Sequence, residues 1–129
     1  MIVVDASVMV EALVGRNPED ELLDALSGDL SAPHVLDLEV LSALRGLVLG
    51  GKLSASDADQ ARHEYFSFAI DRYEATPLAD RIWELRHQFT SYDASYLALA
   101  EALGVPLHTC DAELERGHNA TVRITPRAP

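Results

Sequence analysis

The sequence is short of positive charge and of cysteine, and both shortages narrow the functions that it could have. Its 129 residues hold 10 lysines and arginines against 21 aspartates and glutamates, for a net charge of −11, and Lys52 is the only lysine. Such an acidic surface repels nucleic acid at long range, so a nucleic-acid function would need a local basic patch, bound cations, or both. Acidity that only keeps the protein soluble is the alternative. The single cysteine, Cys110, excludes an internal disulfide framework and is typical of a reducing compartment.

Long apolar runs are also missing. No stretch approaches the roughly 18–20 residues of a membrane span, and the first residues lack the positive flank of a signal peptide. We therefore expect no membrane association and a cytoplasmic location. The hydrophobic content of 48% is that of an ordinary globular chain. No linker or repeat divides it, so we expect one domain over residues 1–129.

What the chain does contain is an alternation of short apolar runs with amphipathic segments. We expect strands at 2–4, 30–33, 73–76, 106–110 and 121–124, and helices at 7–14, 19–27, 35–49, 54–70, 77–89 and 92–105. Strands separated by helices indicate an α/β fold with a central, mainly parallel sheet of about five short strands.

Four acidic residues lie at strand ends or helix starts. Asp5 and Asp111 each follow a predicted strand, so both are expected at the carboxyl edge of the sheet, where parallel sheets carry their ligands. Glu39 falls at the edge of the apolar arc of its helix, and Asp93 lies in the first turn of another. Each acid also has a structural explanation: Asp5 can cap the next helix, and Asp93 can stabilise a helix dipole. Together the four predict one acidic rim.

The segments that carry these acids resemble the PIN-domain ribonucleases, specifically the VapC-type toxins of bacterial toxin–antitoxin pairs. The segments are MIVVDASVMVEAL at 1–13, LEVLSALRGLVLGGKLS at 38–54 and SYDASYLALAEALGVPLHTCDAEL at 91–114. The resemblance implies a three-layer α/β/α PIN-like fold and a four-carboxylate site that binds Mg²⁺ or Mn²⁺ and hydrolyses RNA. It also implies a cognate antitoxin that holds the protein inactive, and a homodimer.

Carried over residue by residue, the resemblance gives the catalytic and metal-binding roles to Asp5, Glu39, Asp93 and Asp111. The residues that it places in support of this cluster are Ser7, Thr109 and Glu113. Ser7 and Thr109 match small hydroxyl positions, and Glu113 stands where members often carry a further acid.

The chemistry explains why acids are wanted. Mg²⁺ is a hard cation that takes oxygen ligands and keeps several waters, so carboxylates can hold it while leaving room for phosphate. The ion would also overcome the repulsion between the acidic protein and RNA. Acids that repel RNA by themselves form a phosphate-binding site together with the cation. Arg45 and Arg86 are the candidate RNA contacts, although a solvated helix face is the better explanation for each of them. An antitoxin segment that carries arginine would suit such an acidic cleft.

Rival functions differ in testable ways. A response-regulator receiver domain requires a lysine at a late strand end, and the only lysine lies in a GGKLS turn. A haloacid-dehalogenase-type phosphatase carries a second acid two residues after the strand-end aspartate, where this chain has Ser7. The remaining competitor is a catalytically weak or inactive PIN-fold protein that works through its protein partner.

Overall fold

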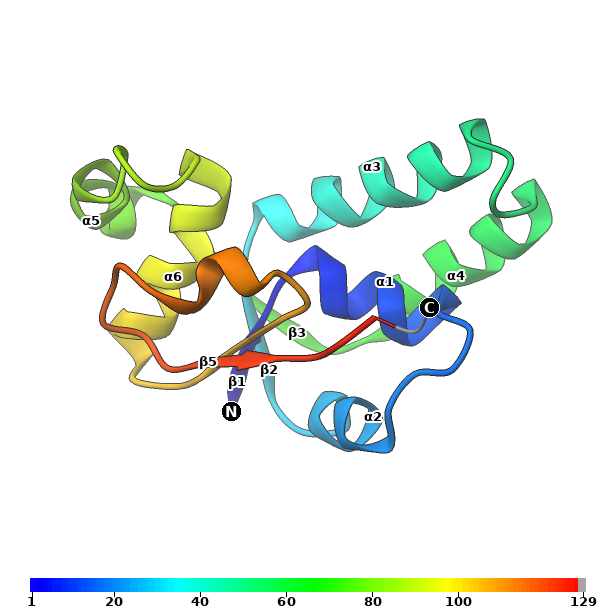
Figure 1. Cartoon of the computed structure of the whole chain (residues 1–129), viewed down its shortest axis with the longest axis horizontal. Coiled ribbons are helices and arrows are strands. Elements are labelled where there is room, and N and C mark those ends of the chain that lie inside the picture. The colour runs from blue at the N-terminus through cyan, green and yellow to red at the C-terminus, as the bar shows by residue number, and fades with distance from the viewer. Residues whose placement is uncertain (128–129) are drawn as a thin grey trace.

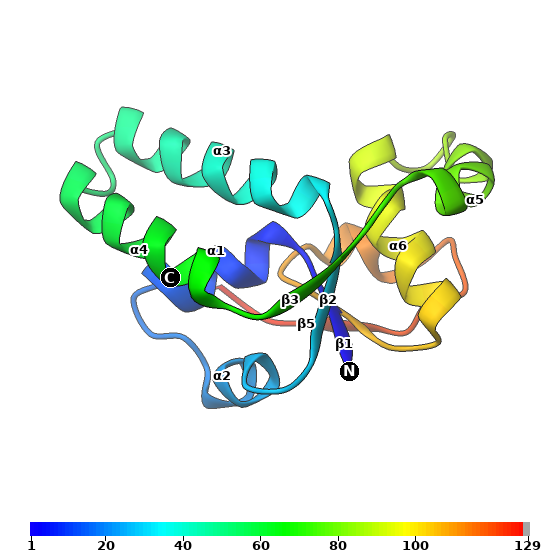
Figure 2. The same ribbon diagram turned by 180° about the vertical axis from the view of Figure 1, so that it is seen from behind.

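The computed structural model describes residues 1–127, which form a five-stranded sheet with helices on both faces (Figures 1 and 2). In chain order the elements are β1 (Ile2–Val4), α1 (Ala6–Val14), α2 (Asp20–Leu26), β2 (Leu30–Pro33), α3 (Val35–Leu49), α4 (Ala55–Ser67), β3 (Ile70–Tyr73), the 3₁₀ turn η1 (Thr76–Leu78), α5 (Ala79–Glu84), α6 (Ser91–Leu103), β4 (Leu107–Thr109), the 3₁₀ turn η2 (Ala112–Glu115) and β5 (Val122–Ile124). Among these residues, no helix is long and apolar enough to cross a membrane.

The sheet is parallel throughout, in the order β3-β2-β1-β4-β5. β1 is the central strand, and its Val3 and Val4 are fully buried because helices cover the sheet from both sides. α5 and α6 lie on one side, and α1, α3 and α4 lie on the other (Figures 1 and 2). This is the three-layer α/β/α architecture expected from the sequence.

The arrangement of β1 and β4 positions the strand-end acids. Val3 pairs with Leu107 and Val4 with His108, so the two strands end beside each other at the same edge of the sheet. Asp5 follows β1 and Asp111 lies two residues beyond β4. The expectation that both acids share the carboxyl edge is therefore confirmed by the register.

Helix α6 is deeply buried along its middle. Every residue from Ala94 to Ala100 is buried, because small alanines let this helix pack closely against β1 and β2. The first turn of α6 is consequently held in a fixed place relative to the central strand. Asp93 lies in that turn.

Most elements differ from the sequence-based expectation by only one to three residues at an end, and two elements differ more clearly. The strand expected at 73–76 is formed by Ile70–Tyr73, because buried Ile70 pairs with Leu30 and the preceding helix ends at Ser67. The apolar pattern continues from α4 into β3, so it did not mark the change from helix to strand.

The helix expected at 77–89 was also too long. Its first turn is the 3₁₀ segment η1, α5 ends at Glu84, and the chain continues through turns. The backbone N–H groups of Gln88 and Phe89 both donate to the carbonyl of Leu85, at 3.1 and 3.0 Å. Buried Leu85 anchors this turn instead of extending the helix.

Candidate active site

Asp5 caps a helix and is also the acceptor of hydrogen bonds from two hydroxyl groups. Its Oδ1 accepts a hydrogen bond from the backbone N–H of Val8 at 3.3 Å, which caps α1. The same oxygen accepts from Ser7 Oγ at 2.5 Å, and Oδ2 accepts from Thr109 Oγ1. The residue is only 7% exposed, and this burial raises the pKa of its carboxyl group although these hydrogen bonds oppose the shift.

The Ser7 and Thr109 hydroxyls join the two strand ends. Ser7 Oγ accepts the backbone N–H of Cys110 at 2.8 Å, and Thr109 Oγ1 accepts that of Asp111 at 3.0 Å. Each hydroxyl thus accepts from the β4 end while it donates to Asp5. The structure places both predicted supporting residues in direct contact with Asp5, where they fix the backbone of Asp111 relative to it.

The Glu39 side chain is held by a hydrogen bond from Tyr96. The Tyr96 hydroxyl of α6 donates to Glu39 Oε1 of α3 at 2.5 Å. Burial, and then the neighbouring Glu39 carboxylate, raise the pKa of Tyr96 far above its usual value, so the phenol stays a neutral donor. Tyr96 was missed by sequence reasoning. Its only signal is that it lies three residues after Asp93, on the same helical face.

Asp93 has no such partner. The hydroxyl of Thr90 caps α6 by accepting the N–H of Asp93 at 3.1 Å, so the Asp93 side chain is not needed as the cap. Within residues 1–127 no group donates a hydrogen bond to the Asp93 carboxylate. Its pKa is raised by burial and then by the negative charges of four nearby acids, in decreasing order Asp111, Glu39, Asp5 and Glu113. The predicted acids therefore lie close enough to Asp93 for their negative charges to raise its pKa.

Asp111 and Glu113 are the remaining members of this group of acids. Asp111 Oδ1 accepts the backbone N–H of Glu113 at 2.9 Å, which starts the η2 turn. Asp111 is half-buried, whereas Glu113 is exposed. The exposed side chain has the larger freedom to approach or leave the site.

Carboxylates are the ligands that a hard cation prefers, but the acids of this site do not form a complete set of metal ligands. Among residues 1–127, no three His, Cys, Asp or Glu side chains form a group that could hold a metal ion. Mg²⁺ does not need one, because it is usually held by one or two carboxylates together with waters and substrate phosphates. The residue best suited to bind it is Asp93, a partly buried carboxylate that lies among like charges and has no donor in the described part of the chain. Asp5 and Asp111 lie at the adjoining strand ends.

The two arginines predicted to contact RNA lie in different surroundings. Arg45 lines a separate pocket of about 280 Å³ between α3 and α4, together with Arg62. Arg86 is exposed, and its guanidinium carbon lies 4.7 Å from the ring centroid of Trp83. Their contact with RNA stays a prediction.

Comparison with known proteins is consistent with this geometry. The family model of the PIN domain matches residues 2–118. "VapC ribonuclease Mb0985" of Mycobacterium bovis is 41% identical over 125 residues, covering 97% of each chain. "Ribonuclease VapC1" of Mycobacterium tuberculosis is 44% identical over 116 residues, covering 87% of this chain and 86% of that protein.

A solved structure agrees at the level of the fold. The crystal structure of PAE2754 from Pyrobaculum aerophilum superposes with a TM-score of 0.73 at 24% identity, and the match covers 93% of this chain and 86% of that one. A match of the family model over most of the chain, with relatives above 40% identity along nearly its whole length, shows that this protein belongs to the PIN-domain family and, within it, to the VapC group.

Proposed function

We propose that this protein is a metal-dependent endoribonuclease and the toxin of a VapBC-type toxin–antitoxin module. The relatives named as ribonucleases support the reaction. The observation that carries the proposal for this chain is the Asp93 carboxylate, which lies partly buried among four like charges and accepts no hydrogen bond from any of residues 1–127. An arrangement of this kind is unfavourable by itself and becomes favourable when a cation is bound.

In this proposal, the residues of the chain would have different roles. Asp93, with Asp5 or Asp111 as a second carboxylate and with waters, would hold Mg²⁺ or Mn²⁺. The ion would supply polarisation of the phosphoryl oxygen and a more acidic bound water. Ser7 and Thr109 hold the Asp5 carboxylate in one orientation. Tyr96 does the same for Glu39, which leaves the second Glu39 oxygen to orient water or phosphate. Glu113 would assist from the exposed edge.

We further propose two protein partners. One is a cognate antitoxin, which would present arginine to the acidic site because a guanidinium binds carboxylates in a bidentate manner. The other is a second copy of this chain. Leu38 and Tyr92 are 66% and 60% exposed and line one pocket with Glu39, while Tyr92 and the 67% exposed Trp83 line the next. Adjoining exposed apolar side chains of this size are typical of an interface.

The dimer can be tested within one helix. Leu38→Arg should make the protein monomeric in sedimentation equilibrium, whereas Leu49→Arg, at a 68% exposed position of the same helix, should leave it dimeric. A monomeric wild type, or dissociation by Leu49→Arg alone, would contradict this choice of face.

The nuclease proposal is tested by mapping RNA ends. Purified protein is incubated with RNA in Mg²⁺, in Mn²⁺ and in chelator, beside Asp5→Asn and Asp111→Asn. We expect new internal ends with either ion, none in chelator and severe loss in both variants. Glu113→Gln should reduce cleavage only modestly. Wild type that binds its antitoxin but leaves RNA intact in both ions would instead support an inactive PIN-fold protein that acts through its partner.

A further inference from the structure

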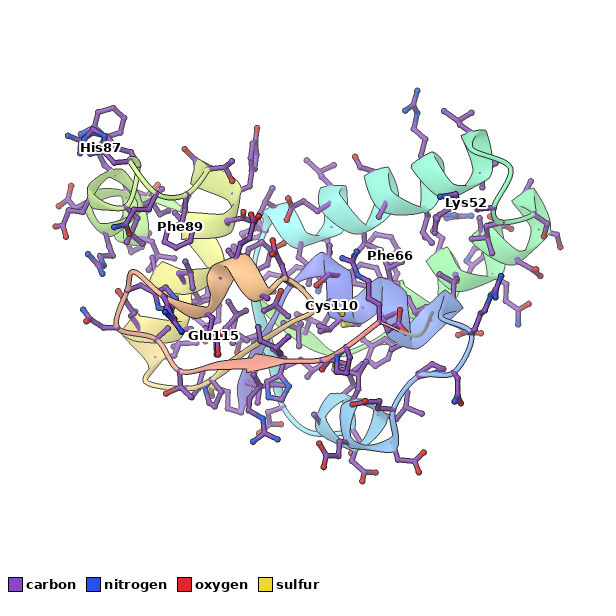
Figure 3. All side chains as sticks on the ribbon, in the orientation of Figure 1. Lys52, Phe66, His87, Phe89, Cys110 and Glu115 are labelled. Atoms are coloured by element: carbon purple, nitrogen blue, oxygen red, sulfur yellow. The ribbon has the colours of Figure 1, made fainter. Side chains whose placement is uncertain are left out.

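A large cleft with positively charged walls opens beside the acidic site. Its volume is about 1050 Å³, and it lies between α1, the turn that links α3 to α4, and the segment after β5. Three cations line it, Arg16, Lys52 and Arg127, together with one acid, Glu11. We call this feature the cationic cleft. Figure 3 shows Lys52 at the α3–α4 turn, while Cys110, which precedes Asp111, lies toward the middle of the molecule.

The concentration of cations in this cleft contrasts with the rest of the molecule. The chain has 10 lysines and arginines and a net charge of −11, yet three of these ten line this one cleft. They come from three segments far apart in sequence: the loop after α1, the α3–α4 turn, and the residues after β5. Folding therefore gathers them where the sequence shows no basic run.

The cationic cleft is continuous with the carboxylates. Ser7 lines the cleft and donates a hydrogen bond to Asp5 at 2.5 Å. Arg127 lines both this cleft and a neighbouring pocket of about 480 Å³ that includes Asp111 and Glu113. A ligand in the cationic cleft would thus lie next to the hydroxyl that holds Asp5 and, past Arg127, next to Asp111 and Glu113.

We propose that the cationic cleft binds the phosphates of a single RNA strand on one side of the bond that is cut. This inference rests on the proposed ribonuclease function and identifies where its substrate strand runs. A volume at the upper limit of the roughly 300–1,000 Å³ typical of small-molecule sites suits a polymer segment. Arginine binds phosphate in a bidentate manner and lysine binds it as a point charge, so the three side chains form a phosphate track.

A charge-matched pair of variants tests the track. Arg16→Gln with Lys52→Gln removes two cations from the cleft. Arg116→Gln with Arg123→Gln removes two exposed cations that do not line it. Binding of a mixed-sequence single-stranded RNA is measured at several salt concentrations with Ca²⁺ in place of Mg²⁺, and cleavage is measured separately with Mg²⁺.

The cleft variant should weaken RNA binding by roughly 25-fold at about 0.1 M salt and reduce the salt slope by about 1.4, since each phosphate contact on a single strand contributes about 0.7. KM for RNA should rise while kcat at saturating RNA is retained, because the carboxylates are untouched. The control variant should behave like wild type in each measurement.

Each other outcome has a distinct meaning. If wild type cleaves RNA and the cleft variant binds and cleaves like the control, the cleft assignment is overturned while the nuclease stands. If wild type does not cleave RNA, the nuclease proposal fails, whichever way the binding changes.

If the cleft variant keeps its RNA affinity but loses binding of polyglutamate, the cleft docks an acidic protein segment and the RNA track is wrong. Should the double variant not fold, Lys52→Gln alone, at an exposed position, must reduce the slope by about 0.7.

Discussion

Asp93 and Asp57 occupy equivalent positions in two helices but have different surroundings. In α6 the hydroxyl of Thr90 accepts the N–H of Asp93 at 3.1 Å, and in α4 that of Ser54 accepts the N–H of Asp57 at 3.0 Å. Asp57 is exposed to solvent, whereas Asp93 is half-buried among acids. The same local motif therefore carries a helix-stabilising acid in one place and an electrostatically strained acid in the other.

This difference predicts opposite effects of amidation on stability. In chelator at neutral pH, Asp93→Asn should melt at the same temperature as wild type or higher, because it removes charge repulsion. Asp57→Asn should melt slightly lower, since it weakens a favourable interaction with the helix dipole. Thermal unfolding followed by circular dichroism measures both.

The pH dependence has a definite sign. The pKa of Asp93 is raised above its usual 3.8, so the folded state binds the proton more tightly and its contribution to stability is lost as pH rises through the folded pKa. The advantage of Asp93→Asn should accordingly shrink as pH is lowered toward about 3.8. An Asp93→Asn protein that melts several degrees lower than wild type in chelator would show that Asp93 has a purely structural role.

Two buried tyrosines provide a second matched comparison. Tyr96 donates to Glu39 at 2.5 Å and Tyr65 donates to Asp37 at 2.7 Å, and both acceptors lie on α3. Tyr96→Phe should reduce RNA cleavage by about 10–100-fold and raise the Mn²⁺ concentration needed for half-maximal rate, because a residue that orients a carboxylate near a metal acts in this way.

Tyr65→Phe should leave the cleavage rate and its Mn²⁺ dependence unchanged while lowering the free energy of unfolding by about 1–3 kcal/mol. The Asp37 carboxylate also binds Arg72 at 2.9 Å, so its partners are Tyr65 and an arginine and not the acids of the candidate site. Equal losses of activity in the two variants would show that Tyr96 contributes only to folding.

At the scale of elements, two glycines test how the helices that carry the acids are built. Gly104 ends α6 with φ of +67°, a conformation that other residues adopt at a cost, whereas Gly46 lies inside α3 with open space around it. Gly104→Ala should lower the free energy of unfolding by about 1 kcal/mol. Gly46→Ala should raise it by about 0.5–1 kcal/mol, because alanine favours helix. Chemical denaturation measures both, and changes of the same sign would contradict the assigned helix end.

Much of the element order was predictable because buried strands and amphipathic helices have different periods. β1, α3 and α6 were expected close to their observed bounds for this reason. β3 and α5 were misplaced because both depend on tertiary contacts: Ile70 pairs with β2, and Leu85 holds a turn together. Local pattern alone does not contain these contacts.

The candidate site, too, was predictable only in part. Asp5 and Asp111 could be placed at one edge from the sequence, because parallel topology brings strand ends together. The contact of Tyr96 with Glu39 could not, since it joins residues 57 positions apart on two helices that lie on different sides of the sheet. Arg127 likewise reaches the cationic cleft only because β5 ends the sheet on that side.

At the scale of the whole molecule, the protein is strongly acidic, yet three of its ten lysines and arginines line one cleft. A net charge of −11 opposes the binding of RNA at long range. On the proposed account, the cationic cleft and a metal ion at the acidic site would together offset this repulsion. The metal would then serve both catalysis and RNA binding, and both should depend on Asp93.

The matched acids Asp93 and Asp57 therefore test the central claim most directly. The measurement is the rate of RNA cleavage across a Mg²⁺ titration by wild type, Asp93→Asn and Asp57→Asn, each purified free of contaminating nuclease. The account predicts Mg²⁺-dependent cleavage by wild type and by Asp57→Asn at similar rates, with cleavage by Asp93→Asn reduced at least a hundredfold at every Mg²⁺ concentration, on the order expected for a lost essential catalytic interaction. Near-wild-type cleavage by Asp93→Asn, or a wild-type rate that does not respond to Mg²⁺, would contradict it.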